Sequence, residues 1–225
     1  MTVLRETVSS AIGALRRDWA FRRAIKRLAR DPAGCAHPGS PVLADLIYGW
    51  GNERFAAVDE YLAACVHHAL GASGPTLECG SGLSTLVVGV IAKQRGRRHW
   101  ALEHSPEWAM RVQRFLKKLA LDSAVVLSVK PLKDYGGYVW YDPPLEAMPD
   151  AFELVVCDGP PGETRGGRYG LVPTMRERLK PGCVILLDDA HRKQERVAAD
   201  RWKSELGASL EVFGATRPYI KMTLI

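Results

Sequence analysis

The sequence predicts an α/β fold with a doubly wound, mostly parallel seven-stranded sheet. From residue 75 onward, short apolar segments alternate with segments of helical periodicity, which is typical of βαβ units. Residues 154–157 and 184–187 are continuously apolar, as strands covered by helices on both faces must be. A chain of 225 residues is long enough for one large core and short for two.

The N-terminal segment predicts an amphipathic basic helix over residues 12–30. Apolar side chains recur there at roughly helical spacing among arginines, and Asp31-Pro32 ends the pattern. The Gly- and Pro-rich residues 31–41 then predict a loop. Residues 52–70 predict a second helix.

The remaining elements follow in βαβ order. The predicted strands are 76–79, 99–102, 125–129, 152–157 and 183–187, and the predicted helices are 83–94, 106–120, 171–179 and 190–206. The tail, residues 210–213 and 219–225 around Gly214, predicts a final antiparallel hairpin. We therefore expect a basic helical arm with its loop over residues 1–50 and the Rossmann-like domain over residues 51–225.

Positive charge is concentrated at the N-terminus. The formal net charge is +6, and residues 1–30 hold eight basic and two acidic side chains, so the rest of the chain is neutral overall. A protein that binds nucleic acid usually has basic residues spread over the surface that contains its active site. Here they are concentrated in the N-terminal segment, which argues against nucleic acid as a partner. Two interpretations of residues 12–30 stay open: a solvated helix packed on the domain, or contact with a membrane surface or an acidic partner.

The cysteines and the N-terminus bear on the compartment. The five cysteines are odd in number, lack CxxC spacing and mostly fall in apolar segments, which is typical of reduced core residues. The N-terminus shows no signal-peptide apolar region and no bilayer-spanning segment. We therefore expect a cytoplasmic protein.

A glycine turn follows the first predicted strand. The segment Glu78-Cys79-Gly80-Ser81-Gly82-Leu83-Ser84-Thr85 opens directly into a helix. Gly80 and Gly82 let the backbone turn sharply and approach a ligand, and the first amides of the helix point at that ligand. Thr85 stands where a dinucleotide-binding fold has its third glycine. The alternative is a tight turn without a ligand.

Glu103 ends the second predicted strand, about twenty residues after the glycine turn. Two ribose hydroxyls can donate hydrogen bonds to one carboxylate, so this position is a candidate ribose ligand. The alternative is a surface acid. His104 is its neighbour in the chain.

The glycine turn, Glu103 and a third acid after the fourth strand resemble class I S-adenosylmethionine-dependent methyltransferases over roughly residues 55–225. The resemblance implies that Glu78 supports the methionine portion of the cofactor, that Gly80 and Gly82 pass beneath it, and that Leu132 lies near adenine. The implied cofactor-binding residues are Glu78, Gly80, Ser81, Gly82, Ser84, Glu103, His104, Leu132 and Asp158.

Carboxylates gather after the fourth and fifth predicted strands, at Asp158, Asp188 and Asp189. Three such groups repel one another unless they are paired, protonated or bridged by a cation, and oxygen ligands suit Mg²⁺ or another hard divalent ion. The placement resembles catechol-type and sugar-modifying O-methyltransferases, which implies that these three acids are metal ligands. The alternative has Asp188 capping the next helix and Asp189 on the surface.

One departure from that pattern concerns the catalytic base. Pro160-Pro161 replaces the basic or acidic residue that those enzymes place after the fourth-strand acid. His191 is the candidate substitute, because an imidazole can accept a hydroxyl proton near neutral pH. Its alternative is a surface histidine.

The glycine-rich residues 162–170 predict a mobile substrate loop or lid. Arg165 and Arg168 on this loop could pair with a carboxylate or phosphate of the acceptor, or with Asp158. A solvated loop is the alternative. The aromatic segments 48–52 and 138–142 could line an acceptor pocket or pack in the core, and the residues alone do not decide this.

Taken together, the residues predict an S-adenosylmethionine-dependent methyltransferase, with O-methylation of a small-molecule or sugar-like acceptor, anionic if the loop arginines bind it. Asp158 and His191 are the candidate catalytic residues. The alternatives are a nucleic-acid or protein methyltransferase, a nicotinamide-dependent oxidoreductase and a non-catalytic binding protein. The missing third glycine argues against the oxidoreductase. The acceptor, the methylated atom and the oligomeric state are not predicted.

Overall fold

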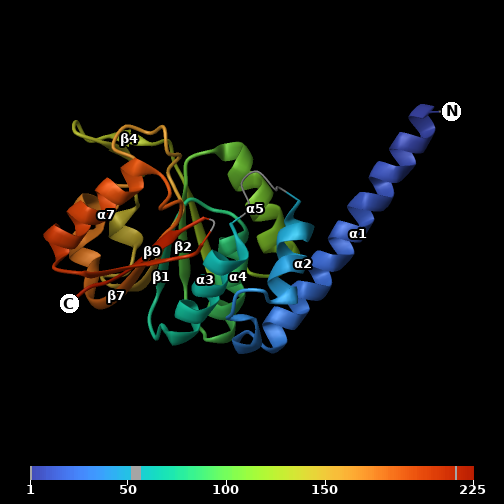
Figure 1. Cartoon of the computed structure of the whole chain (residues 1–225), viewed down its shortest axis with the longest axis horizontal. Helices are drawn as coiled ribbons and strands as arrows, with labels where there is room; N and C mark the ends of the chain where they lie inside the picture. The colour runs from blue at the N-terminus through green and yellow to red at the C-terminus, as the bar shows by residue number, and fades with distance from the viewer. Residues whose placement is uncertain (1, 52–56, 216) are drawn as a thin grey trace.

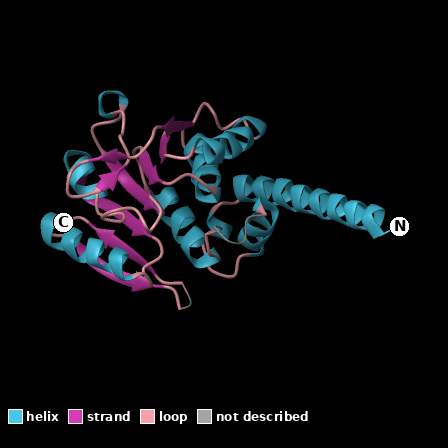
Figure 2. Cartoon of the chain, turned by 90° about the horizontal axis from the view of Figure 1, so that it is seen from above, coloured by secondary structure: helices cyan, strands magenta, loops and turns pink. Residues whose placement is uncertain are grey.

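The computed structural model describes residues 2–51, 57–215 and 217–225, with the backbone alone for residues 2–11. Its main sheet has seven strands in the order β3-β2-β1-β6-β7-β9-β8. Figure 2 shows the strands together in one part of the molecule, with helices around them. The first five strands are mutually parallel, and β9 runs antiparallel to both β7 and β8. The predicted doubly wound, Rossmann-like fold with its C-terminal hairpin is confirmed.

The main-sheet strands are β1 (Thr76–Cys79), β2 (His99–Glu103), β3 (Val125–Val129), β6 (Phe152–Cys157), β7 (Leu179–Leu187), β8 (Ser209–Phe213) and β9 (Tyr219–Thr223). A small second sheet pairs β4 (Lys133–Asp134) with β5 (Val139–Trp140). The α-helices are α1 (Thr2–Arg30), α2 (Pro41–Trp50), α3 (Asp59–Gly71), α4 (Leu83–Gln94), α5 (Pro106–Lys118), α6 (Leu171–Met175) and α7 (Lys193–Leu206). Short 3₁₀ helices are η1 (Ala33–Cys35), η2 (Leu145–Ala147) and η3 (Arg176–Arg178).

Helices cover both faces of the sheet, because successive strand side chains point to opposite sides. Leu154 and Val156 of β6 pack with α3, α4 and α5, whereas Val155 and Cys157 pack with α6 and α7. Figure 1 shows α7 on one side of the strands and α3, α4 and α5 on the other. Both faces of the central strands are therefore buried, which explains their continuous apolar sequence.

The segment before α3 differs from the prediction. Residues 41–50, expected in part as a loop, form α2, which begins with Pro41 after Ser40 and buries Val42, Leu43, Leu46 and Trp50. The helix predicted over 52–70 is confirmed from Asp59 as α3; residues 57 and 58 are not helical, and residues 52–56 lie outside the described part of the chain. The two glycines at the end of α2 obscured its short apolar pattern.

Two later helices are shorter than predicted. The segment expected as one helix over 171–179 is α6 followed by η3, and β7 begins at Leu179 rather than Cys183. The helix expected from Ala190 begins at Lys193, after a turn in which Asp189 has φ +58°. Residues 190–192 form this turn, in which the amide of Arg192 donates to the carbonyl oxygen of Asp189 at 2.9 Å, so α7 begins only after it.

Helix α1 is the N-terminal extension, and it ends at Arg30 as predicted. Its C-terminal half buries one face against the domain, through Ala20, Phe21, Ala24, Ile25 and Leu28. Its N-terminal half extends away from the domain (Figure 1). None of the helices in the described part of the chain is both long and apolar enough to cross a membrane.

The close approach of α1 to α2 depends on Gly49. A Cβ atom at this position would lie 2.6 Å from Cβ of Phe21 and 2.9 Å from the carbonyl oxygen of Arg17. Both contacts are with α1, and one is with its backbone, so the helices would have to separate. Gly49 therefore sets the distance between the extension and the domain.

We expect Gly49→Ala to lower the free energy of unfolding by about 1–3 kcal/mol, the usual cost of overpacking a close contact. Gly13→Ala is the matched control, because it is also a helical glycine but has no atom within 4 Å of the added methyl. The control should be neutral or stabilising by up to about 1 kcal/mol. Urea denaturation measures both variants, and equal stabilities would contradict the assignment.

Candidate functional site

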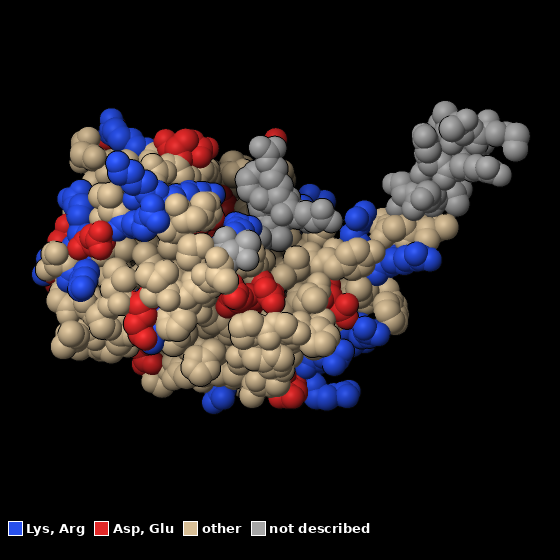
Figure 3. Space-filling model, viewed as in Figure 1, with Lys and Arg blue, Asp and Glu red and all other residues tan. Residues whose placement is uncertain are grey.

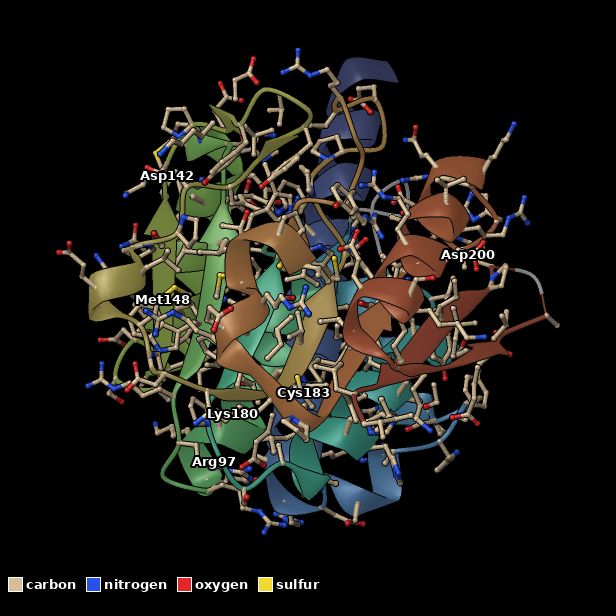
Figure 4. The ribbon with its side chains drawn as sticks, turned by 90° about the vertical axis from the view of Figure 1, so that its left-hand side faces the viewer. Arg97, Asp142, Met148, Lys180, Cys183 and Asp200 are labelled. Atoms are coloured by element: carbon tan, nitrogen blue, oxygen red, sulfur yellow. The ribbon has the colours of Figure 1, made fainter. Side chains whose placement is uncertain are left out.

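A cavity of about 780 Å³ lies at the carboxyl edge of the sheet, where ligands bind in open α/β folds. Figure 4 shows the two edges: Arg97, before β2, lies near one end of the molecule and Asp142, after β5, toward the other. The lining includes seven of the predicted site residues: Gly80, Ser81, Glu103, His104, Asp158, Asp188 and Asp189. Five others are not among the described residues that line it: Glu78, Gly82, Ser84, Leu132 and His191.

The glycine turn connects β1 to α4 and is held against the end of β6. Gly80 has φ +88°, and a Cβ there would lie 3.0 Å from the amide nitrogen of Gly159. Glycine is therefore required at position 80 for both conformation and space. The amide of Gly82 donates to Oγ1 of Thr85 (2.7 Å), so Thr85 caps the start of α4 instead of acting as a third glycine.

Glu78, in β1, is fully buried and is not among the residues that line the cavity. Oγ of Ser84 donates to it at 2.5 Å, and its other oxygen lies 3.0 Å from Nε2 of His99. Nδ1 of His99 lies 2.8 Å from Oγ1 of Thr76. These contacts join β1, β2 and α4 beneath the turn, so Glu78 supports the turn without reaching the cavity.

Glu103 fixes the turn from the side of β2. One carboxylate oxygen accepts from the amide and Oγ of Ser81 at 3.0 and 2.8 Å. The other accepts from the amides of His104 and Ser105 at 2.7 and 2.8 Å. Burial opposes ionisation, but the donors from His104, Ser105 and Ser81 outweigh it and lower the pKa of Glu103. An ionised acceptor thus lies at the cavity wall, beside the glycine turn.

A buried arginine organises the ends of β6 and β7. We call Arg168, Asp158, Asp188, Asp189 and Glu195 the Arg168 cluster. The Arg168 side chain is 1% exposed and donates to the carbonyl oxygens of Cys157 (3.2 Å), Asp158 (2.9 Å) and Asp188 (2.7 Å). It also donates to the carboxylates of Asp158 (3.1 Å) and Asp189 (2.8 Å).

The acids of the Arg168 cluster differ in protonation. Burial and the charge of Asp188 raise the pKa of Asp158 well above its usual range. Burial and the charge of Asp189 likewise raise the pKa of Asp188. Burial would also raise the pKa of Asp189, but Arg168, Arg192 and Arg217 outweigh it and lower that pKa. The lowered pKa favours the ionised form of Asp189, whereas the raised pKa favours the protonated form of Asp158.

The cluster does not fit a divalent ion in this arrangement. Oxygens of Asp158, Asp188 and Asp189 do lie within 4.8 Å of one another, as a metal site requires. However, Arg168 contacts two of these acids, and Arg192 and Arg217 contact Asp189 at 2.8 and 3.2 Å. A guanidinium about 4 Å from a divalent ion repels it by roughly 8 kcal/mol at an effective dielectric constant of about 20. Arg168 is 1% exposed and lies among these acids, so a positive charge is already present beside them.

Within the glycine-rich segment 162–170, Gly167, Arg168 and Gly170 are buried whereas Glu163 and Arg165 are exposed, and the expectation of a substrate loop did not foresee the burial of Arg168. Arg168 does pair with Asp158, one of the partners predicted for it. Arg165 pairs instead with Asp134, at the surface. The segment is therefore held to the strand ends through Arg168.

Two other predicted residues lie apart from the cavity. His191 is exposed in the turn before α7 and is not among the lining residues, so its role as a base stays a prediction. Leu132 packs against the core on the α6 and α7 face of the sheet. The catalytic and binding assignments of these residues find no support in their positions.

The cavity wall contains polar residues that were not predicted as site residues, among them Tyr141, Arg192 and Arg217. Tyr141 belongs to the aromatic segment 138–142, which was expected either to line a pocket or to pack in the core; its side chain lines the cavity, and its buried hydroxyl has no hydrogen-bond partner among the described residues. An unpaired buried hydroxyl costs about 1–3 kcal/mol, which a bound ligand with an acceptor atom would recover. No periodicity or motif in the sequence marks this position.

The sequence family described as a methyltransferase domain matches residues 77–190, half of the chain. Curated proteins give no match. Several solved structures share the fold. A precorrin-6Y C5,15-methyltransferase from Geobacter metallireducens is 19% identical, with TM-score 0.58 over 77% of this chain and 92% of its own. An S-adenosylhomocysteine-bound methyltransferase from Podospora anserina is 17% identical, with TM-score 0.58 over 89% and 96%. A Thermotoga maritima S-adenosylmethionine-dependent O-methyltransferase is 16% identical, with TM-score 0.58 over 82% and 72%.

These likenesses at low identity concern the fold, whereas the family match covers the glycine turn, Glu103 and the acids after β6 and β7. The match decides against the oxidoreductase hypothesis. Residues 77–190 carry the strand ends that form the cavity, so the matched segment and the site coincide. The chain belongs to the methyltransferase-domain family.

Proposed function

We propose that this methyltransferase binds S-adenosylmethionine across the Gly80–Gly82 turn and methylates a hydroxyl oxygen of a small polar acceptor beside Asp158. The observation that carries the proposal is that one cavity holds the glycine turn, the ionised Glu103 and Asp158. The cavity volume of about 780 Å³ suits a nucleoside cofactor with a small acceptor better than a macromolecule.

Glu103 and the glycine turn bind the cofactor in this proposal, and Asp158 lies beside the acceptor. Glu103 accepts hydrogen bonds from the ribose hydroxyls, and the backbone of the Gly80–Gly82 turn passes beneath the cofactor. When bound, the cofactor supplies a methyl group on a positively charged sulfur, which is a good leaving group. The chain's contribution is mainly alignment of acceptor oxygen, methyl carbon and sulfur.

Asp158 receives the proton of the acceptor hydroxyl. As the new C–O bond forms, the C–S bond breaks and its electron pair stays on sulfur, while the O–H proton passes to the Asp158 carboxylate. Burial and the charge of Asp188 raise the pKa of this carboxyl, which makes its ionised form a stronger base than an ordinary aspartate. The 29% exposure of the Asp158 side chain leaves it open to the cavity.

Arg168 supplies the fixed positive charge in this site, and we propose that turnover needs no divalent metal. Burial alone would lower the pKa of Arg168, but the surrounding acids, Asp158 first among them, raise it above its usual value. The guanidinium is therefore permanently charged, as a resident cation would be. It keeps Asp158 directed at the acceptor and balances the neighbouring acids.

Glu103→Ala should weaken binding of S-adenosylmethionine or S-adenosylhomocysteine about tenfold or more, because the ribose loses a charged acceptor. Isothermal titration calorimetry measures the affinity. Glu107→Ala is the matched control, since Glu107 is exposed on α5 and outside the cavity. If the wild-type protein bound neither ligand, or if both variants bound as the wild type does, the proposed function would be wrong.

Asp158→Asn should lower turnover about 100-fold or more while leaving most cofactor affinity, because it removes the proton acceptor and keeps the shape. Only the ionised carboxylate accepts a proton, so wild-type turnover should rise with pH through the raised pKa of Asp158 and then level off. The variant should lack this acidic limb. A pH–rate profile with the same limb in both proteins would assign the base elsewhere.

Wild-type turnover and melting temperature should be unchanged by EDTA and by added Mg²⁺, because Arg168 already balances the acids. Arg168→Met should be destabilised by about 3–5 kcal/mol, since it leaves buried acids unpaired. Its melting temperature should then rise with Mg²⁺ by roughly 5 °C, as the vacated position accepts a cation. Loss of wild-type turnover on chelation would overturn the metal-free assignment, whether or not the variant folds.

A further inference from the structure

The outer face of α1 carries an exposed apolar stripe that the proposed site does not use. Ile12, Leu15 and Trp19 are spaced three and four residues apart and therefore lie on one side of the helix. Their exposed fractions are 45%, 71% and 62%, which are high for side chains of this size. We call these three residues the outward stripe.

The outward stripe cannot turn inward without breaking the packing of α1. The opposite face of the helix is the one that packs on the domain, and Phe21 and Leu28 on that face are 2% and 0% exposed. Phe21 contacts Phe115 of α5 with ring centroids 5.0 Å apart, and Asp18 accepts from Lys118 of α5 at 2.5 Å. These contacts fix the rotation of α1, so the stripe stays directed away from the domain.

Basic side chains flank the outward stripe. Arg16, Arg22, Arg23 and Lys26 are all exposed, and the guanidinium of Arg23 lies 4.7 Å from the ring centroid of Trp19. Figure 3 shows Lys and Arg along the described part of this helix. Arg22 and Arg23 have acidic partners in Asp18 and Asp45, but the arm still carries eight basic and two acidic residues.

We propose that α1 lies on an anionic lipid surface, with the outward stripe entering the boundary between headgroups and acyl chains. Tryptophan favours this boundary, and long arginine and lysine side chains can reach the phosphates beside it. The helix lies on the surface and does not cross it, since it is not apolar enough to span a bilayer. A second copy of the chain is a poorer occupant, because two arms of equal positive charge repel each other, whereas a negative surface attracts them.

The full chain is mixed with vesicles of phosphatidylcholine alone or with about 30% phosphatidylserine, and bound protein is measured by co-sedimentation. Binding is expected only to the anionic vesicles and should weaken as salt is raised. Leu15→Ser with Trp19→Ser should weaken binding at least fivefold. Arg16→Gln with Lys26→Gln should weaken it about 25-fold, since each basic residue near such a surface contributes a factor of about five.

Matched controls lie on the domain. Val212→Ser removes an apolar side chain that is 61% exposed, and Arg95→Gln with Arg176→Gln removes two exposed charges; both should bind as the wild type does. The cofactor affinity of each variant shows whether it is folded. The vesicle-binding measurement does not depend on which acceptor the enzyme methylates. Equal binding by stripe and control variants would overturn the proposal. So would a dimer, detected by light scattering without lipid, that Leu15→Ser with Trp19→Ser dissociates, because the stripe would then be a contact between copies.

Discussion

The site depends on one buried guanidinium. Arg168 donates to three carbonyl oxygens at the ends of β6 and β7 and to two carboxylates. Parallel strands leave unpaired carbonyls where they end, and these usually turn to water or to a ligand. Here the Arg168 guanidinium donates to these carbonyl oxygens, and its positive charge also stabilises several acids close together. Without it, burial and mutual repulsion would protonate the acids or force them apart.

The same guanidinium determines the conformation around it. Asp189 has φ +58°, a strained geometry for an aspartate, and three arginines on its carboxylate offset that strain. The glycine-rich segment 162–170 lies against the strand ends because Arg168 belongs to it. The placement of the acids and the position of this segment are thus both linked to a single side chain.

Sequence reasoning worked where the constraint is local or periodic. The strands of the parallel sheet could be predicted because burial on both faces requires continuous apolar residues, and the glycine turn because Gly80 has a conformation that other residues avoid. It could not predict that Arg168 is buried, because a buried arginine is stable only with partners that folding brings from residues 157, 158, 188, 189 and 195. The aspartates therefore suggested a metal, and the sequence did not show that Arg168 of the chain itself contacts two of them.

The extension and the glycine turn are joined by packing. Phe21 of α1 contacts Phe115, Phe115 contacts Trp50 at 5.1 Å, and Trp50 contacts Trp108 at 5.9 Å between ring centroids. The indole nitrogen of Trp108 donates to the carbonyl oxygen of Ser81, in the turn itself. Trp108, which lines the cavity, is therefore connected to α1 through Trp50 and Phe115. A rigid extension fixed in this way would hold the cavity at a constant height and orientation above any surface on which α1 rests.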